Sequence, residues 1–212
     1  MIRLSKIKKE EAVKVSIASI DKGHHQVTYR GVKAIRCPFD YVIYQMIISE
    51  VQPDLIIEIG TRKGGGAYYL ADLLDSFGKG IIHTIDIVDE VESIVKKHER
   101  ISFFTDGWAG YNLEMAKGFD KILIIEDASH MYEDTIGVLN KFHPLVSKES
   151  YFIVEDGIIN ELGLEKKYNG GPLRAIREFL PEHPEFNVDR KWCDMFGKNA
   201  TFNVNGYLKK IR

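Results

Sequence analysis

Residues 53–70 read PDLIIEIGTRKGGGAYYL, a stretch that combines a strand, a glycine-rich turn and the start of a helix. Residues 55–59 are apolar apart from Glu58, as expected for a buried strand. Gly60 and three consecutive glycines at residues 64–66 then punctuate the chain. Ligands of open α/β sheets bind beyond the carboxyl ends of the strands, where glycine lets the backbone approach them closely. The stretch therefore predicts a nucleotide-type binding turn, with an ordinary strand-to-helix connection as the alternative.

Apolar runs and helix-like segments alternate on both sides of this turn. Further strands are predicted at residues 81–87, 101–104, 121–127 and 151–156, and a closing antiparallel hairpin at residues 186–192 and 201–208. Helices are predicted at residues 41–51, 67–77, 90–98, 109–117, 132–142 and 171–180. This alternation predicts an α/β fold with a mostly parallel, seven-stranded sheet and helices on both faces.

Composition limits the kinds of partner. The 212 residues include 29 Lys and Arg against 31 Asp and Glu, for a formal charge of −2. This balance argues against a general nucleic-acid or anionic-membrane binder and favours a small-molecule partner. No apolar run approaches the roughly 20 residues that a membrane-spanning helix needs.

The N-terminal residues and the two cysteines indicate how the chain is divided and in which redox setting it works. Residues 1–30 carry clustered Lys and Glu around a weak apolar pattern, so we expect an N-terminal extension that contributes to a homo-oligomer. Residues 31–212 are expected to form a single domain. Cys37 and Cys193 lie far apart and no basic-then-apolar leader precedes them, which favours a reduced, cytoplasmic setting.

Three carboxylates follow two strands that this topology places side by side. Asp127 follows one apolar run, and Glu155 and Asp156 follow the other. Neighbouring carboxylates raise one another's pKa unless a cation offsets their charge. Oxygen ligands of this kind suit Mg²⁺, Mn²⁺ or Ca²⁺. A divalent metal site is therefore predicted, the alternative being that these acids cap helices or pair with Arg174 and Arg177.

Glu58 and Asp86 form a second acidic pair, at the first two strands of the predicted sheet. An acid at the end of the second strand accepts hydrogen bonds from ribose in dinucleotide sites. The dinucleotide fingerprint, however, would need glycine where this chain has Arg62, so NAD is disfavoured. Glu58 would repel pyrophosphate and attract a cation, which favours S-adenosylmethionine (SAM), a ligand with an ammonium, a sulfonium and no phosphate. Glu58 could equally be a buried acid held by backbone N–H groups, and both descriptions can be true.

His130 stands three residues after Asp127, where the chain turns from strand to helix. A histidine titrates near physiological pH and could remove the proton of a substrate hydroxyl. A structural or solvated histidine is the alternative.

Several segments together resemble the cephalosporin hydroxylase family, from about residue 28 onward. They are Ile35-Arg-Cys-Pro-Phe-Asp40, Ile56-Ile-Glu-Ile-Gly-Thr61, Gly64-Gly-Gly-Ala67, Ile124-Ile-Glu-Asp-Ala-Ser-His130, Tyr151-Phe-Ile-Val-Glu-Asp-Gly157, Gly171-Pro172 with Ala175-Ile176, and Asn205-Gly-Tyr-Leu208. The resemblance implies a Rossmann-like class I SAM-dependent methyltransferase fold. It also implies kinship with metal-dependent O-methyltransferases that act on antibiotic sugars.

The resemblance also implies roles for individual residues. Metal ligands would be Asp127, Glu155 and Asp156, and His130 with Asp127 would serve catalysis. Residues expected to bind SAM are Glu58, Gly60, Thr61, Gly64, Gly65, Gly66, Asp86 and Gly107. The expected function is metal-dependent methylation of a hydroxyl on a sugar or another small natural product, with Mg²⁺ or another divalent cation.

Two other functions compete with methyl transfer. A non-haem iron hydroxylase normally needs two histidines and one carboxylate, and here only His183-Pro184-Glu185 offers a local spacing of that kind. A non-catalytic module that keeps a SAM or metal pocket is the second rival. The complete acidic set argues against the latter.

Overall fold

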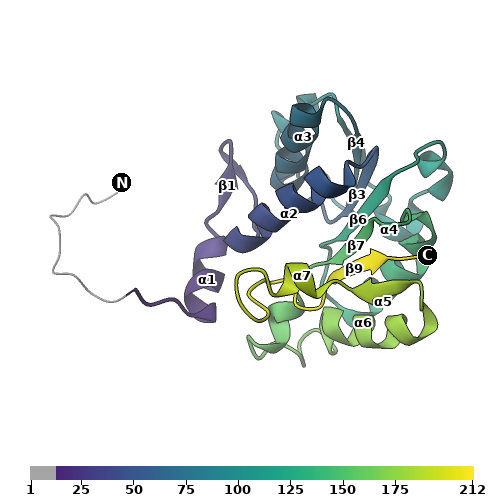
Figure 1. Ribbon diagram of the computed structural model, residues 1–212. Helices are drawn as coiled ribbons and strands as arrows, with labels where there is room; N and C mark the ends of the chain where they lie inside the picture. The colour runs from purple at the N-terminus through teal and green to yellow at the C-terminus, as the bar shows by residue number, and fades with distance from the viewer. Residues whose placement is uncertain (1–12) are drawn as a thin grey trace, which may run out of the picture.

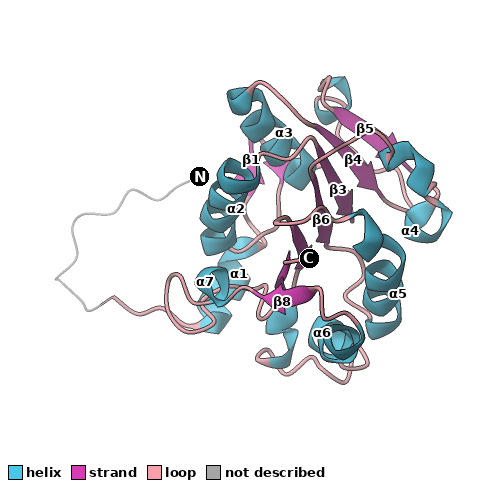
Figure 2. Ribbon diagram, turned by 45° about the vertical axis from the view of Figure 1, so that its right-hand side comes forward, coloured by secondary structure: helices cyan, strands magenta, loops and turns pink. Residues whose placement is uncertain are grey.

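The computed structural model describes residues 13–212 and contains the predicted seven-stranded sheet (Figures 1 and 2). The strand order is β5-β4-β3-β6-β7-β9-β8, and β9 runs antiparallel to both of its neighbours while the other pairs are parallel. The strands are β3 Leu55–Ile59, β4 Ile81–Ile85, β5 Ile101–Phe104, β6 Ile122–Glu126, β7 Tyr151–Val154, β8 Phe186–Val188 and β9 Tyr207–Lys210. The predicted mostly parallel sheet with a C-terminal antiparallel hairpin is confirmed.

Helices cover both faces of the sheet (Figure 2). Helices α2 (Pro38–Val51) and α3 (Gly65–Phe77) pack on one face, and α5 (Tyr132–Phe142) and α6 (Gly171–Glu182) pack on the other. Successive strand residues point to opposite faces, so Ile56 packs toward α2 and α3 whereas Ile57 packs toward α5. Both faces are apolar, which explains why the central strands read as continuous rather than alternating apolar runs.

Two predicted helices are shorter than the sequence suggested. Residues 90–98 contain only the 3-10 turn η1 (Val95–Lys97), because the N–H of Glu92 donates to the carbonyl of Lys63. Residues 109–117 are split into α4 (Gly107–Gly110) and η2 (Leu113–Ala116), since the side chain of Asn112 caps the second segment. The helical prediction for both stretches was therefore wrong in extent.

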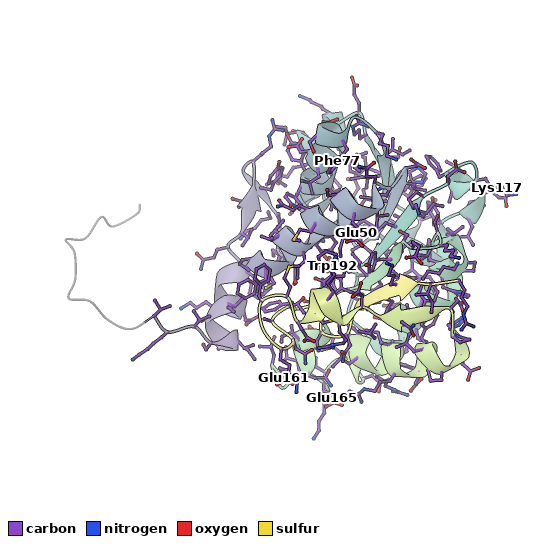
Figure 3. All side chains as sticks on the ribbon, viewed as in Figure 1. Glu50, Phe77, Lys117, Glu161, Glu165 and Trp192 are labelled. Atoms are coloured by element: carbon purple, nitrogen blue, oxygen red, sulfur yellow. The ribbon has the colours of Figure 1, made fainter. Side chains whose placement is uncertain are left out.

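The closing hairpin is also shorter than predicted. Asp189 accepts a hydrogen bond from the N–H of Lys191, and the chain forms the helix α7 (Arg190–Cys193) where strand was expected. Figure 3 shows Glu50 of α2 and Trp192 of α7 near each other, and Lys191 pairs with Glu50 at 2.8 Å. Strand β9 begins only at Tyr207, because the residues before it are held by α2.

Asp40 in α2 makes that attachment. Its carboxylate is fully buried and accepts hydrogen bonds from the Thr201 hydroxyl, the Phe202 N–H at 3.0 Å and the Tyr207 hydroxyl at 3.0 Å. Asp40 thus ties the C-terminal loop to α2.

Burial raises the pKa of Asp40 to about 7, which predicts a pH-dependent contribution to stability. Between about pH 4 and 7 the folded state keeps a proton that the unfolded state releases, so this carboxyl lowers stability as pH rises through that window. We expect Asp40→Asn to lose this decline. Urea unfolding of both proteins between pH 5 and 8 measures it, and parallel stability profiles would contradict the assignment.

The N-terminal segment reaches the domain through a short hairpin. Residues 1–12 lie outside the described part, so the expected extension can be followed only from residue 13. Helix α1 (Ile17–His24) precedes strands β1 (Thr28–Tyr29) and β2 (Val32–Lys33), which form a separate two-stranded sheet. The hydroxyl of Tyr29 donates to Asp72 of α3 at 2.6 Å. Among residues 13–212, the structure contains no helix long and apolar enough to cross a membrane.

Residues 157–170 form the 3-10 turn η4 (Gly157–Asn160) followed by further turns. Ile158 and Ile159 are buried in this segment, and Figure 3 shows Glu161 and Glu165 at the lower margin of the molecule. No residue of this segment lines the cavity described below.

Candidate active site

A cavity of about 630 Å³ opens where the carboxyl ends of β3, β4, β6 and β7 meet. Most of the residues predicted to form the site line it. They are Glu58, Gly60, Thr61, Gly66, Asp86, Gly107, Asp127, His130, Glu155 and Asp156. Gly64 and Gly65 do not line it. One cavity thus contains both acidic groups that the sequence indicated.

Each glycine of the turn between β3 and α3 meets a different structural requirement. Gly60 has φ +107°, and a Cβ there would lie 2.0 Å from the carbonyl oxygen of Asp127. Gly64 takes the left-handed conformation that precedes α3, and Gly65 packs against the backbone of Lys33. Of the three consecutive glycines, only Gly66 borders the cavity, and a Cβ there would lie 2.7 Å from Glu58 Oε1. The close approach to a ligand therefore concerns Gly66, while the other two allow the chain to pack.

Asp86 follows β4 and organises the turn. One oxygen accepts hydrogen bonds from the N–H groups of Thr61 at 2.9 Å and Arg62 at 2.8 Å, and the other accepts from Ile87 at 2.7 Å. Asp86 also faces the cavity. A hydrogen bond from a ribose hydroxyl to this carboxylate stays a prediction.

Glu58 lies in β3, almost completely buried, with its carboxylate toward α3. It accepts a hydrogen bond from the Thr84 hydroxyl at 2.7 Å, not from the N–H groups of the turn that the sequence had suggested as an alternative. Burial raises its pKa to about 7, although Arg36 and Thr84 act in the opposite direction. Glu58 is thus a carboxylate whose ionised form a cationic ligand would stabilise.

Asp127, His130 and Asp156 form a cluster that also lines the cavity. Their ligand atoms all lie within 4.8 Å of one another, and His130 Nε2 is 3.1 Å from Asp156 Oδ2. Burial, followed by the charge of Glu155, raises the pKa of Asp127 well above its usual value, and burial also raises that of Asp156. His130 and Asp156 both have φ near +60°, a backbone conformation that costs free energy outside glycine. A divalent cation would relieve the charge repulsion that this grouping creates.

Glu155 is beside this group but is also bound by other residues. Its Oε1 accepts hydrogen bonds from Arg36 Nη2 at 2.6 Å, Arg36 Nε at 3.0 Å and the Tyr44 hydroxyl at 2.7 Å. Its Oε2 accepts one longer bond, from Arg36 Nε at 3.2 Å. Oε2 is therefore the oxygen that remains free to bind a metal ion.

Arg36 is the residue at this site that the sequence reasoning missed. It is 4% exposed, and its Nη2 lies 3.6 Å from Asp127 Oδ2 and 3.9 Å from Glu58 Oε1. Burial acts to lower its pKa, but Glu155, Tyr44 and Asp127 together raise it well above the ordinary value. Arg36 belonged to one of the segments that carried the family resemblance, which is the signal that could have indicated it. The guanidinium is a permanent cation among three carboxylates.

The sheet order, the single antiparallel strand and the cavity at the carboxyl ends define a class I methyltransferase fold. Solved structures of this fold are similar to the chain. CmcI crystallised as "cmcI-D160 Mg-SAM" gives a TM-score of 0.66 at 20% identity, over 89% of this chain and 78% of that one. The O-methyltransferase TomG from Streptomyces achromogenes, in complex with SAM, gives 0.56 at 16% identity, over 94% and 92%.

Residues 22–211 match the family model described as Rhamnosyl O-methyltransferase/CmcI, and the chain belongs to this family of O-methyltransferases. The Rhamnosyl O-methyltransferase of Mycobacterium tuberculosis (strain ATCC 25618 / H37Rv) is 29% identical over 192 residues, 86% of this chain and 78% of the relative. The protein of the same name from Mycobacterium leprae (strain TN) is 27% identical over 191 residues, 85% and 82% of the two chains. The predicted family, fold class and enzyme class are confirmed.

Proposed function

We propose that this chain transfers the methyl group of SAM to a hydroxyl of a sugar or another small natural product, with the help of a divalent cation. The observation that carries the proposal is the single cavity that joins a corner suited to a cationic ligand, at Glu58 and Gly66, to the acidic group of Asp127, Glu155 and Asp156. The family and the magnesium and SAM named for CmcI support it.

The residues present fit a hard divalent cation. Asp127 and Asp156 are partly buried carboxylates with raised pKa values, and Glu155 has a second oxygen held by a single longer hydrogen bond. Oxygen ligands of this kind suit Mg²⁺. These three residues would hold the ion, while Arg36 and Tyr44 would fix the orientation of Glu155, as partners of metal ligands commonly do.

His130 is placed to receive a proton. Its Nε2 lies 3.1 Å from Asp156 Oδ2, and one ring nitrogen of a neutral imidazole is a hydrogen-bond acceptor. Nδ1 is buried and has no hydrogen-bond partner among residues 13–212. A bound divalent cation would supply Lewis acidity that lowers the pKa of the acceptor hydroxyl. As the oxygen–carbon bond forms and the carbon–sulfur bond breaks, the hydroxyl proton would pass to His130 or water, and positioning of the two reactants would supply most of the rate.

The rival iron site does not coincide with the cavity. His183 and Glu185 form a cluster with His143 elsewhere in the fold, and none of the three lines the cavity. Within the cavity, Asp127 and Asp156 stand with one histidine, His130, which is not the two-histidine, one-carboxylate set of such oxygenases. This arrangement supports methyl transfer.

A homo-oligomer and a cytoplasmic setting also belong to the proposal. Val13 and Val15 are exposed on the segment before α1, and the two cysteines are buried and unpaired. Light scattering after size-exclusion chromatography tests the oligomer, and a monomer at micromolar concentration would contradict it.

A thermal-shift panel tests the central proposal. SAM and its demethylated product S-adenosylhomocysteine are expected to raise the melting temperature, because a ligand that binds only the folded state stabilises it. NAD and 2-oxoglutarate serve as controls, each with and without Mg²⁺. Stabilisation by NAD alone, or by 2-oxoglutarate alone, would overturn the proposal.

A further inference from the structure

The corner of the cavity beside Gly66 is bordered by two opposite charges. A Cβ on Gly66 would lie 2.7 Å from Glu58 Oε1 and 3.5 Å from Arg36 Nη1. A Cβ would crowd the carboxylate, so glycine lets the backbone pass close to both the carboxylate and the guanidinium. Both groups line the cavity and are almost completely buried.

One nitrogen of the guanidinium is left without a partner. Nε and Nη2 of Arg36 donate to Glu155, whereas Nη1 is buried and has no hydrogen-bond partner among residues 13–212. A buried, charged donor without an acceptor is costly, and native proteins satisfy such groups with a ligand or an ordered water. Nη1 is thus a donor that awaits an acceptor from the cavity.

The pair of charges matches an amino-acid zwitterion. Glu58 can accept from an α-ammonium, and Arg36 Nη1 can donate to an α-carboxylate, and both side chains line the same cavity. We infer that Arg36 Nη1 donates to the α-carboxylate of the methionine moiety of SAM, opposite Glu58. This inference rests on the proposed function, because it takes SAM as the methyl donor.

The assignment gives Arg36 two simultaneous tasks. One edge of the guanidinium holds Glu155, and the remaining nitrogen holds the cofactor. Arginine can do both because its donors form a rigid, planar fork, whereas the single ammonium of lysine cannot. Arg36 would therefore link the position of the methionine moiety to the acidic group that faces the acceptor.

Decarboxylated SAM, which lacks only the α-carboxylate, provides the test. Calorimetry should show that the wild-type protein binds SAM about 10- to 100-fold more tightly than decarboxylated SAM, the range expected for a hydrogen bond between charged groups. In Arg36→Met the two ligands should bind within about threefold of each other, because only the contact with SAM is lost. Arg36→Lys, which keeps a positive charge beside Glu155, should give an intermediate ratio.

Tyr44→Phe is the matched control. It removes another partner of Glu155 at 2.7 Å but leaves Arg36 Nη1 unchanged, so the ratio should stay at the wild-type value. If Arg36 had a purely structural role, Arg36→Met would weaken the binding of SAM and of decarboxylated SAM equally. The ratio of the two affinities would then stay at the wild-type value, and this result would overturn the inference.

Measurements on the wild-type protein alone distinguish a failure of the proposed function from a failure of the role assigned to Arg36. If it binds neither ligand, the proposed function fails. If it binds both ligands equally, SAM remains the donor and the role of Arg36 is wrong. This second result would stand even if Arg36→Met did not fold, since it needs no variant.

Discussion

Asp127→Asn is expected to weaken Mg²⁺ binding at least about 100-fold, beyond the 10- to 100-fold that loss of an outer partner of a metal site typically costs. The substitution keeps the shape of the side chain but removes its charge. Burial raises the pKa of Asp127 well above its usual value and the charges of Glu155 and Asp156 raise it further, so a bound cation would favour its ionised form. Calorimetric titration of Mg²⁺ with S-adenosylhomocysteine present measures the loss, and methyl transfer should fall with it.

Glu126→Gln is the control for this prediction. Glu126 is the preceding residue and is also buried with a pKa raised to about 7, but its carboxylate accepts from the Ala128 N–H at 3.3 Å and does not line the cavity. The same substitution there should leave Mg²⁺ affinity within about threefold of the wild-type value, because Glu126 does not line the cavity and offers no ligand oxygen to an ion there. If Asp127→Asn binds Mg²⁺ normally, the metal site lies elsewhere.

Glu58→Gln is expected to weaken SAM binding about 10- to 150-fold, which corresponds to the roughly 1.5 to 3 kcal/mol of a hydrogen bond to a charged group. The amide is nearly isosteric with the carboxylate and can still accept from the Thr84 hydroxyl, so the protein should fold normally. The lost attraction is to the positive charges of SAM. Calorimetry at pH 8 gives the comparison.

The same carboxyl predicts a pH dependence of SAM affinity. The pKa of Glu58 is raised to about 7 by burial, so below that pH the ligand-free protein carries a neutral carboxyl. A cationic ligand prefers the ionised form, and binding must then expel a proton. Affinity should fall up to about tenfold for each pH unit below the pKa and level off above it.

Thr84→Val sharpens this test. The Thr84 hydroxyl stabilises the ionised form of Glu58, so its removal should raise the pKa further and shift the fall in affinity to higher pH. Glu58→Gln should show no such fall. A wild-type affinity that is constant from pH 6 to 8 would contradict the role of Glu58.

Local sequence patterns were sufficient to predict most strands and helices of the fold. The continuous apolar runs of β6 and β7 report burial on both faces, a property of each segment by itself. Because parallel strands bring their carboxyl ends to one edge, the positions of Asp127 and Glu155 followed from the order of the strands. The helices at residues 90–98 and 109–117 were overestimated, since hydrogen bonds to the Lys63 carbonyl and to the Asn112 side chain compete with helix there.

Contacts between residues far apart in the sequence could not be predicted from local patterns. Arg36 reaches Glu155 across 119 residues of sequence, and nothing in the residues around either one indicates the pairing. The separate roles of Gly64, Gly65 and Gly66 depend on how α3 packs against Lys33 and β3. Asp40 is a further example, because its partners lie more than 160 residues away.

The hydrogen bonds of Asp86 have a consequence for ligand choice. Phosphate-binding turns keep successive backbone N–H groups open as a small anion-binding nest. Here the N–H groups of Thr61 and Arg62 already surround the carboxylate of Asp86. The carboxylate of Asp86 thus occupies the anion-binding position of this turn. A phosphorylated nucleotide would meet a filled site with a negative charge at its centre.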